Sequence, residues 1–116
     1  MSTPGIKVVL HPVSDVAKTK AMYAALLGVQ PSADSSYYVG FDAGGQHVGL
    51  VPDGGPQRMT SPVAYWDVPD IEATVAELTA AGATVAEPVH DVGGGRLVAT
   101  VTDTDGNVIG ILQDQS

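Results

Sequence analysis

The sequence predicts an α+β fold made of two copies of one unit, in which a strand and a helix are followed by further strands. Runs of β-branched residues of strand length alternate with two segments whose apolar residues recur at helical spacing. In addition, residues 13–16 match residues 68–71, and residues 48–51 match residues 109–112. Because neither copy could bury both faces of its own sheet, we expect the two copies to share one structure.

The first copy begins with a strand over residues 6–13, which is rich in β-branched side chains. Ser14 is expected to cap the following helix, and Asp15 to lie in its first turn, where the helix dipole favours a negative charge. Gly28 should end this helix after about 13 residues. Its apolar stripe consists of Val16, Met22, Tyr23, Leu26 and Leu27.

Two strands at residues 37–41 and 46–51 complete the first copy as a hairpin closed by glycines. The second copy repeats the same order. Pro69, at the first helical position, and Asp70 should open its helix, which Gly82 should end. The strands of the second copy are expected at residues 61–68, 84–87, 96–101 and 108–112.

Length and composition exclude several classes of function. The 116 residues should form a single domain, with its two modules at about residues 5–58 and 60–114. With 13 acidic against 5 basic side chains, the net charge of −8 excludes the basic surface that nucleic-acid binding needs. The absence of cysteine excludes disulfides, thiolate metal sites and a cysteine nucleophile. No apolar run is long enough for a membrane span and no targeting segment is evident, so we expect a cytoplasmic protein.

Short motifs near both ends of the chain carry a family resemblance. Residues 13–15, 22–23 and 27–28 resemble the first-module signature of the vicinal oxygen chelate superfamily, the glyoxalase, bleomycin-resistance and extradiol-dioxygenase group. Residues 103–107, together with residues 108–111, resemble the closing turn and strand of that superfamily. The resemblance implies tandem βαβββ modules that form a curved, cup-shaped mixed sheet with the helices on the outside, and often a homodimer.

Four positions correspond to the metal ligands of the metal-using members. In those members, mostly His, Gln and Glu side chains from the first and last strand of each module hold one divalent ion. Counting from the helix-opening acids and the closing turn places these positions at Val8, Gly49, Val63 and Gly110. None of the four side chains can donate a lone pair, and their immediate neighbours do not supply a ligand set either. We therefore expect neither a metal ion nor another cofactor.

Strand parity predicts which residues face the implied cup, because residues two apart share a face. The resulting set is mostly apolar with a few polar groups, as is typical of a small-molecule pocket. Tyr65 and Asp67 are the strongest candidates, since they share a face and a carboxylate on an apolar strand must be solvated or paired. The candidate ligand-binding residues are Val8, Tyr38, His47, Gly49, Val63, Tyr65, Asp67 and Gly110.

Several polar and aromatic residues also have an ordinary structural interpretation. His47 lies near a glycine hairpin, where a histidine is more often simply exposed, and Asp67 is equally well explained as an exposed residue at a strand end. Parity directs His11 toward the helices and Trp66 into the core. Neighbouring strand residues point to opposite faces, so the His-Asp pair at residues 90–91 is expected in a turn.

Three classes of function are compatible with these residues. The favoured class is a metal-free, small-molecule-binding dimer that sequesters an antibiotic or metabolite, with an apolar ligand suited to the lining or a cationic one suited to the negative charge. The alternative is a lyase, epimerase or dioxygenase with a displaced metal site, or with an acid–base site that uses His47, Tyr65 and Asp67. The third is a protein-interaction module with a vestigial cup. The sequence identifies no catalytic residue, and fold alone does not assign a function.

Overall fold

The computed structural model describes residues 3–55 and 59–114 and contains two units, each built from a strand, a helix and three strands in that order. Residues 7–63 form the first unit, and residues 64–114 form the second, together with the described residues before residue 7. This element order confirms the predicted α+β class and the predicted repeat. The expected end of the first module near residue 58 lies outside the described residues.

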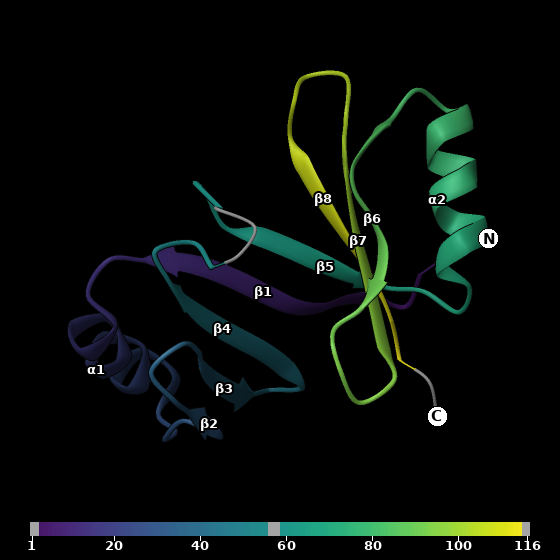
Figure 1. Cartoon of the computed structure of the whole chain (residues 1–116). Coiled ribbons are helices and arrows are strands. Elements are labelled where there is room, and N and C mark those ends of the chain that lie inside the picture. Colours follow the sequence, from purple (N-terminus) through teal and green to yellow (C-terminus); the bar gives the residue numbers. More distant parts are fainter. Residues whose placement is uncertain (1–2, 56–58, 115–116) are drawn as a thin grey trace. The chain divides into compact units, whose positions relative to one another are not determined.

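The first unit contains a mixed sheet and one helix (Figure 1). Its elements are β1 (Gly5–Val13, which begins in the residues of the second unit), α1 (Val16–Leu27), β2 (Ala33–Asp34), β3 (Val39–Ala43) and β4 (Gln46–Pro52). The strand order is β2-β3-β4-β1, in which β1 runs parallel to β4 and β3 pairs antiparallel with both β2 and β4. Gly44 and Gly45 take positive φ angles of 58° and 81° at the β3–β4 turn, which confirms the predicted hairpin.

The second unit repeats this topology. Its elements are β5 (Val63–Asp67, whose first residue belongs to the first unit), α2 (Ile71–Ala80), β6 (Thr84–Asp91), β7 (Arg96–Thr102) and β8 (Val108–Asp114). The strand order is β5-β8-β7-β6, in which β5 runs parallel to β8 and β7 pairs antiparallel with both β6 and β8. The strands β5 and β8 are therefore the counterparts of β1 and β4.

The helix starts differ from the sequence prediction by one residue. Asp15, and not Ser14, is the N-cap of α1, because its carboxylate accepts a hydrogen bond from the Lys18 amide at 3.1 Å. Asp70 caps α2 in the same way, so Pro69 precedes the helix and does not open it. A carboxylate competes well with serine for this position, because it also faces the positive end of the helix dipole.

The helix ends agree more closely with the sequence. Gly28 ends α1 in the left-handed conformation with φ of 73°, as predicted. The helix α2 ends at Ala80, and Ala81 caps it just before Gly82, whose φ is 115°. Neither described helix is long and apolar enough to span a membrane.

Two strand predictions need correction. The strand β6 continues to Asp91, so His90 and Asp91 are paired with β7 and do not form a turn. Register shifts between Val85 and His90 break the period of two in β6, which explains why the sequence pattern ends early. The strand β2 was not predicted, because two residues are too short to show a period.

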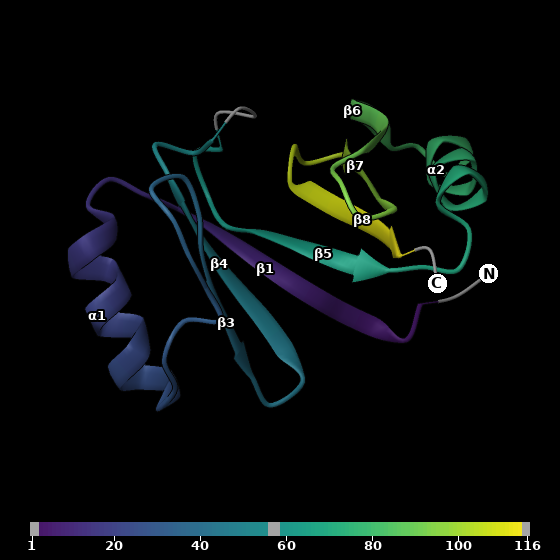
Figure 2. The ribbon, with the colours of Figure 1, turned by 60° about the horizontal axis from the view of Figure 1, so that its bottom comes forward.

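Each unit buries one face of its sheet against its own helix (Figure 2). In the first unit, Val39, Phe41 and Leu50 form a cluster against which side chains of α1 pack. In the second unit, Val68, Ile71, Ala99 and Ile111 form the corresponding cluster with α2. Because neighbouring strand residues point to opposite faces, the residues that alternate with these clusters lie on the face away from the helix.

Candidate functional site

The face of the first unit away from α1 carries four of the predicted ligand-binding residues. Val8 in β1 lies directly opposite His47 in β4, and Leu10 lies opposite Gly49. A Cβ atom added to Gly49 would lie 2.6 Å from Leu10 Cδ2, so both residues are on the same face. Tyr38, just before β3, also reaches this face. The register therefore brings Val8, His47 and Gly49 to one face, as parity predicts, and Tyr38 reaches the same face from the turn before β3.

A chain of hydrogen bonds links three side chains on this face. The Tyr38 hydroxyl lies 2.5 Å from His47 Nε2, and His47 Nδ1 lies 2.8 Å from Asp42 Oδ1. The Tyr38 and His47 rings are nearly parallel, with an angle of 8° and a centroid distance of 5.9 Å. Asp42 and His47 are direct partners across the β3–β4 hairpin, which fixes their spacing through the backbone.

The carboxylate of Asp42, at one end of these hydrogen bonds, determines where the protons of His47 and Tyr38 lie. An ionised Asp42 can only accept a hydrogen bond, so His47 Nδ1 carries a proton. With a neutral imidazole, Nε2 is the acceptor and the Tyr38 hydroxyl donates to it. The hydrogen bond from His47 is the main reason that the pKa of Asp42 is lowered from its ordinary value of 3.8, and Ser32 contributes a second hydrogen bond. Asp42 is therefore a carboxylate at neutral pH.

Two glycines make room for the rings of Tyr38 and His47. Gly40 and Gly49 are opposite each other on β3 and β4. A Cβ atom at Gly40 would lie 2.7 Å from the His47 ring, and a Cβ atom at Gly49 would lie 2.5 Å from the Tyr38 hydroxyl oxygen. Real Cβ atoms do not approach other atoms this closely, so a larger residue at either position would displace the aromatic pair.

The loop before β3 holds Tyr38 in place. The Ser35 hydroxyl donates to the Tyr38 carbonyl oxygen at 3.1 Å and accepts from the Tyr38 amide at 3.2 Å. The Ser35 amide donates to the same carbonyl at 2.9 Å. These bonds close a tight turn that directs the Tyr38 side chain over β3 and β4. The His47 side chain is 24% exposed and the Asp42 side chain 67% exposed, so one end of the hydrogen-bonded chain reaches solvent.

The equivalent face of the second unit is packed instead of polar. Tyr65 lies directly opposite Gly110, and a Cβ atom at Gly110 would lie 2.6 Å from the Tyr65 ring. Tyr65 is only 1% exposed and Val63 only 4%, and Val8 in the first unit is only 5% exposed, so these three are core residues and not the open lining that the sequence suggested. Asp67 is half-buried, and its carbonyl oxygen accepts a hydrogen bond from the Thr3 hydroxyl.

The four positions that correspond to metal ligands do not suit a metal ion. Val8 and Val63 offer only aliphatic side chains, and the space beside Gly49 and Gly110 is filled by tyrosine rings. Within residues 3–55 and 59–114, no group of three or more His, Asp or Glu side chains is arranged to hold a metal. The donor set that a divalent ion requires is therefore not built by these residues.

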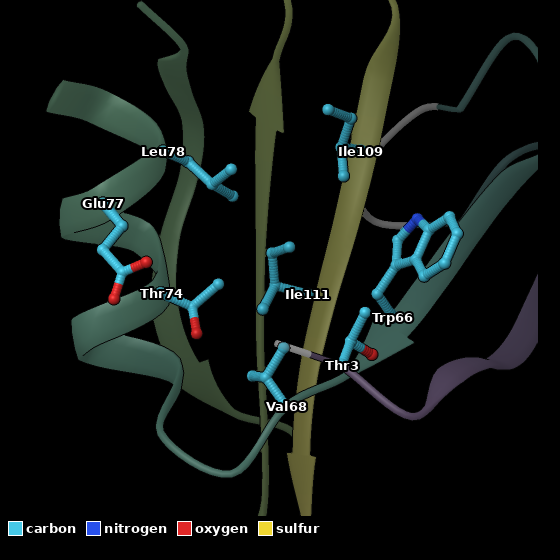
Figure 3. Close-up of a pocket in the computed structure, with 8 residues that line it drawn as sticks. All are labelled: Thr3, Trp66, Val68, Thr74, Glu77, Leu78, Ile109 and Ile111. Carbon is cyan, nitrogen blue, oxygen red and sulfur yellow. The ribbon is translucent and has the colours of Figure 1, made fainter. Parts of the chain in front are cut away.

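His11 and Trp66 lie on the faces of the sheets that pack against the helices. His11 packs against Tyr23 of α1 with a ring centroid distance of 5.4 Å, as parity predicts, and burial lowers its pKa below the ordinary value of 6.5. Trp66 also faces its helix, but it is half-buried and borders a cavity of about 450 Å³ between α2 and the sheet (Figure 3). The cavity is lined by Thr3, Trp66, Val68, Thr74, Glu77, Leu78, Ile109 and Ile111.

Sequence reasoning missed Asp42 and Gly40. A signal for Asp42 was present, because a two-residue turn at residues 44–45 places residue 42 opposite residue 47. Gly40 gave no such signal, since its role depends on how the neighbouring rings pack.

Comparisons with known proteins agree with this architecture. The sequence model of the Glyoxalase/Bleomycin resistance protein/Dioxygenase superfamily matches residues 5–111. Comparison with curated proteins gave no match.

Three solved structures illustrate the similarity in fold. A glyoxalase/bleomycin resistance protein/dioxygenase superfamily member from Vibrio splendidus 12B01 is 18% identical, with a TM-score of 0.72 over 93% of this chain and 97% of its own. Methylmalonyl-CoA epimerase from Mycobacterium tuberculosis is 14% identical, with a TM-score of 0.73 over 98% and 90%. The Mn(II)-bound glyoxalase from Novosphingobium aromaticivorans is 23% identical, with a TM-score of 0.73 over 97% of this chain and 39% of its own. At these identities the likeness shows the fold alone.

Proposed function

Because this chain belongs to the Glyoxalase/Bleomycin resistance protein/Dioxygenase superfamily, we propose that it binds a small molecule without a metal ion. The binding site is the face of the first unit that carries Tyr38, His47 and Gly49. The observation that carries this proposal is the Tyr38 ring over Gly49. A polar aromatic group there takes the place of the metal-binding side chain that the family resemblance leads one to expect.

The chemistry of this face indicates the class of ligand. Leu10 supplies apolar surface, whereas Tyr38, His47 and Asp42 supply a few directed polar groups, a mixture typical of small-molecule sites. The carboxylate of Asp42 and the net charge of −8 favour a cation, and an aromatic face adds cation–π attraction. An apolar molecule that carries a positive charge fits this combination.

Ligand-induced thermal stabilisation tests the binding proposal. A panel of apolar amines and neutral apolar molecules should contain compounds that raise the melting temperature saturably, since a ligand at a hundredfold excess over its Kd stabilises the fold by about 2.7 kcal/mol. The variant Tyr38→Ala should lose this stabilisation. The neighbouring Tyr37→Ala is the matched control, because Tyr37 is 77% exposed.

Equal stabilisation of both variants would place the ligand elsewhere, and no stabilisation by any compound would favour an interaction module. The alternative proposal is that the protein is a lyase, epimerase or dioxygenase of this superfamily. Turnover of a bound compound would support that alternative.

We also propose that the protein works as a homodimer in the cytoplasm. The α1 side chains Met22 and Leu26 are 68% and 75% exposed, and apolar side chains exposed on one helix support self-association. Light scattering of the purified protein should give twice the chain mass of 11.8 kDa. A monomer at micromolar concentration would contradict the dimer, and fractionation of the native host tests the location.

A further inference from the structure

The cavity between α2 and the sheet of the second unit has the size of a small-molecule site. Its volume of about 450 Å³ lies within the range of about 300 to 1,000 Å³ that is usual for such sites. We infer that it takes a small aromatic amine, in which a flat apolar ring carries a short chain with an ammonium group. This site goes beyond the proposed function and does not depend on it, because its lining residues all belong to the other unit.

The repeat shows why the cavity is present in this unit. It aligns Trp66 and Leu78 with His11 and Tyr23 of the first unit. In the first unit, these positions hold two rings whose centroids are 5.4 Å apart, so they bridge the space between helix and sheet. In the second unit, Leu78 is aliphatic and smaller than tyrosine, and both residues line the cavity. The cavity therefore results from a difference between the two copies and not from the topology that they share.

The walls of the cavity are apolar and include one aromatic side chain. Figure 3 shows Leu78 pointing from α2 toward the sheet, where Ile109 and Ile111 of β8 and the indole of Trp66 on β5 complete the lining. Trp66 is half-buried, although parity predicted it in the core, so part of this side chain stays accessible. An indole stacks favourably on a flat ring and also attracts a cation.

The polar groups of the cavity favour a positive charge. Glu77 on α2 is exposed and lines the cavity, so its carboxylate lies where the cavity meets solvent. The Thr74 hydroxyl donates to the Asp70 carbonyl oxygen at 2.8 Å, so toward a ligand it can act only as an acceptor. None of the described residues that line the cavity is basic, and the net charge of the chain is −8. An ammonium group at the mouth is therefore favoured over a carboxylate, with the ring inside against Trp66.

The fluorescence of Trp66 tests this site directly, because Trp66 is the single tryptophan of the chain. The protein is titrated with phenethylamine, with the neutral phenethyl alcohol and with the anion phenylacetate. Excitation at the red edge of the absorption band selects tryptophan over tyrosine. The amine should shift the emission to shorter wavelength in a saturable manner, since its ring displaces water from the indole. The alcohol should bind more weakly, and the anion most weakly.

Two variants locate the response in the cavity. Glu77→Gln keeps the size of the side chain and removes its charge, so it should weaken the affinity for phenethylamine by about two- to fivefold and leave that for the alcohol unchanged. Leu78→Tyr introduces the residue that the first unit has at this position, and it should abolish the response to all three probes. Glu72→Gln is the matched control, because Glu72 is exposed on the same helix but is not a lining residue. The melting temperature without probe verifies that each variant folds, and Glu77→Gln changes only an exposed group.

Several results would overturn the proposal. They are the absence of a saturable shift with any probe, equal affinity for the amine and the alcohol, and an affinity for the amine that Glu77→Gln leaves unchanged. A shift in emission with protein concentration alone would mean that a second copy of the chain covers the cavity, which also contradicts a small-molecule site. The emission of Trp66 reports this cavity, whereas the loss of stabilisation in Tyr38→Ala reports the face of the first unit. Either proposal can therefore fail while the other stands.

Discussion

The two units share one topology and one glycine position, yet they use a tyrosine in different ways. In the second unit, Tyr65 comes from β5, lies opposite Gly110 and is almost completely buried. In the first unit, the corresponding strand partner of Gly49 is Leu10, and Tyr38 arrives from the turn before β3. The first tyrosine is hydrogen-bonded to a histidine that in turn bonds a carboxylate, whereas the ring of the second is buried in the core. The same backbone thus supports a polar site in one copy and a core in the other.

Truncating the two tyrosines should give the largest difference in stability. Tyr65→Ala removes a buried ring and should lower the free energy of unfolding by about 3–5 kcal/mol. Tyr38→Ala removes a half-buried ring and should cost about 1 kcal/mol. Denaturant titration of both variants measures these values. Equal losses would mean that Tyr38 is as much a core residue as Tyr65.

Replacing Gly49 or Gly110 by alanine tests the same difference between the two units. Gly110→Ala forces a Cβ atom against the Tyr65 ring and the Ala64 carbonyl oxygen, neither of which can move, so we expect a loss of about 1–3 kcal/mol. Gly49→Ala meets only the far ends of the Tyr38 and Leu10 side chains, which can shift more easily than a backbone carbonyl, so the loss should be smaller.

The Gly49→Ala variant has a second readout. Displacing Tyr38 breaks its hydrogen bond to His47, which should shift the imidazole resonances of His47 in NMR spectra. An unchanged His47 signal together with unchanged stability would show that Gly49 is not needed for the aromatic pair.

The smallest expected effect is on the pH dependence of stability, through His11 on the helix-facing side of the first unit. Burial lowers the pKa of His11, so the unfolded chain binds more protons than the folded one as the pH falls through 6.5. Stability should therefore fall on acidification from about pH 7.5 to about pH 5.5. His11→Gln should reduce this pH dependence when the denaturation midpoint is compared at both pH values. A variant with the wild-type pH dependence would assign the effect to other groups.

Much of the fold follows from local signals in the sequence. Three local patterns predict elements that are present in the folded protein. They are the repeat, the helix-capping acids and the period of two in the strands. Gly28 and the glycines of the β3–β4 turn take the positive φ angles that their positions require. Errors arise where local signals conflict, as at Asp15, or where a strand contains bulges, as in β6.

The candidate site was predictable only in part. Parity places His47 and Gly49 on one face, and the hairpin register would have added Asp42. The approach of Tyr38 depends on hydrogen bonds with Ser35 in a turn that has no strong sequence signature. The burial of Tyr65 depends on packing around its ring, which parity does not report. Sequence patterns thus specify faces, whereas the distances between side chains come from tertiary structure.

We propose that the tyrosines beside Gly49 and Gly110 fill the space in which the family resemblance leads one to expect metal ligands, so that the protein binds no metal ion there. Elemental analysis of the protein after dialysis against Ni²⁺, Zn²⁺, Mn²⁺ and Fe²⁺, with the melting temperature recorded for each sample, tests this claim most directly. We expect far less than one metal ion per chain and an unchanged melting temperature. One bound ion per chain together with a raised melting temperature would contradict it.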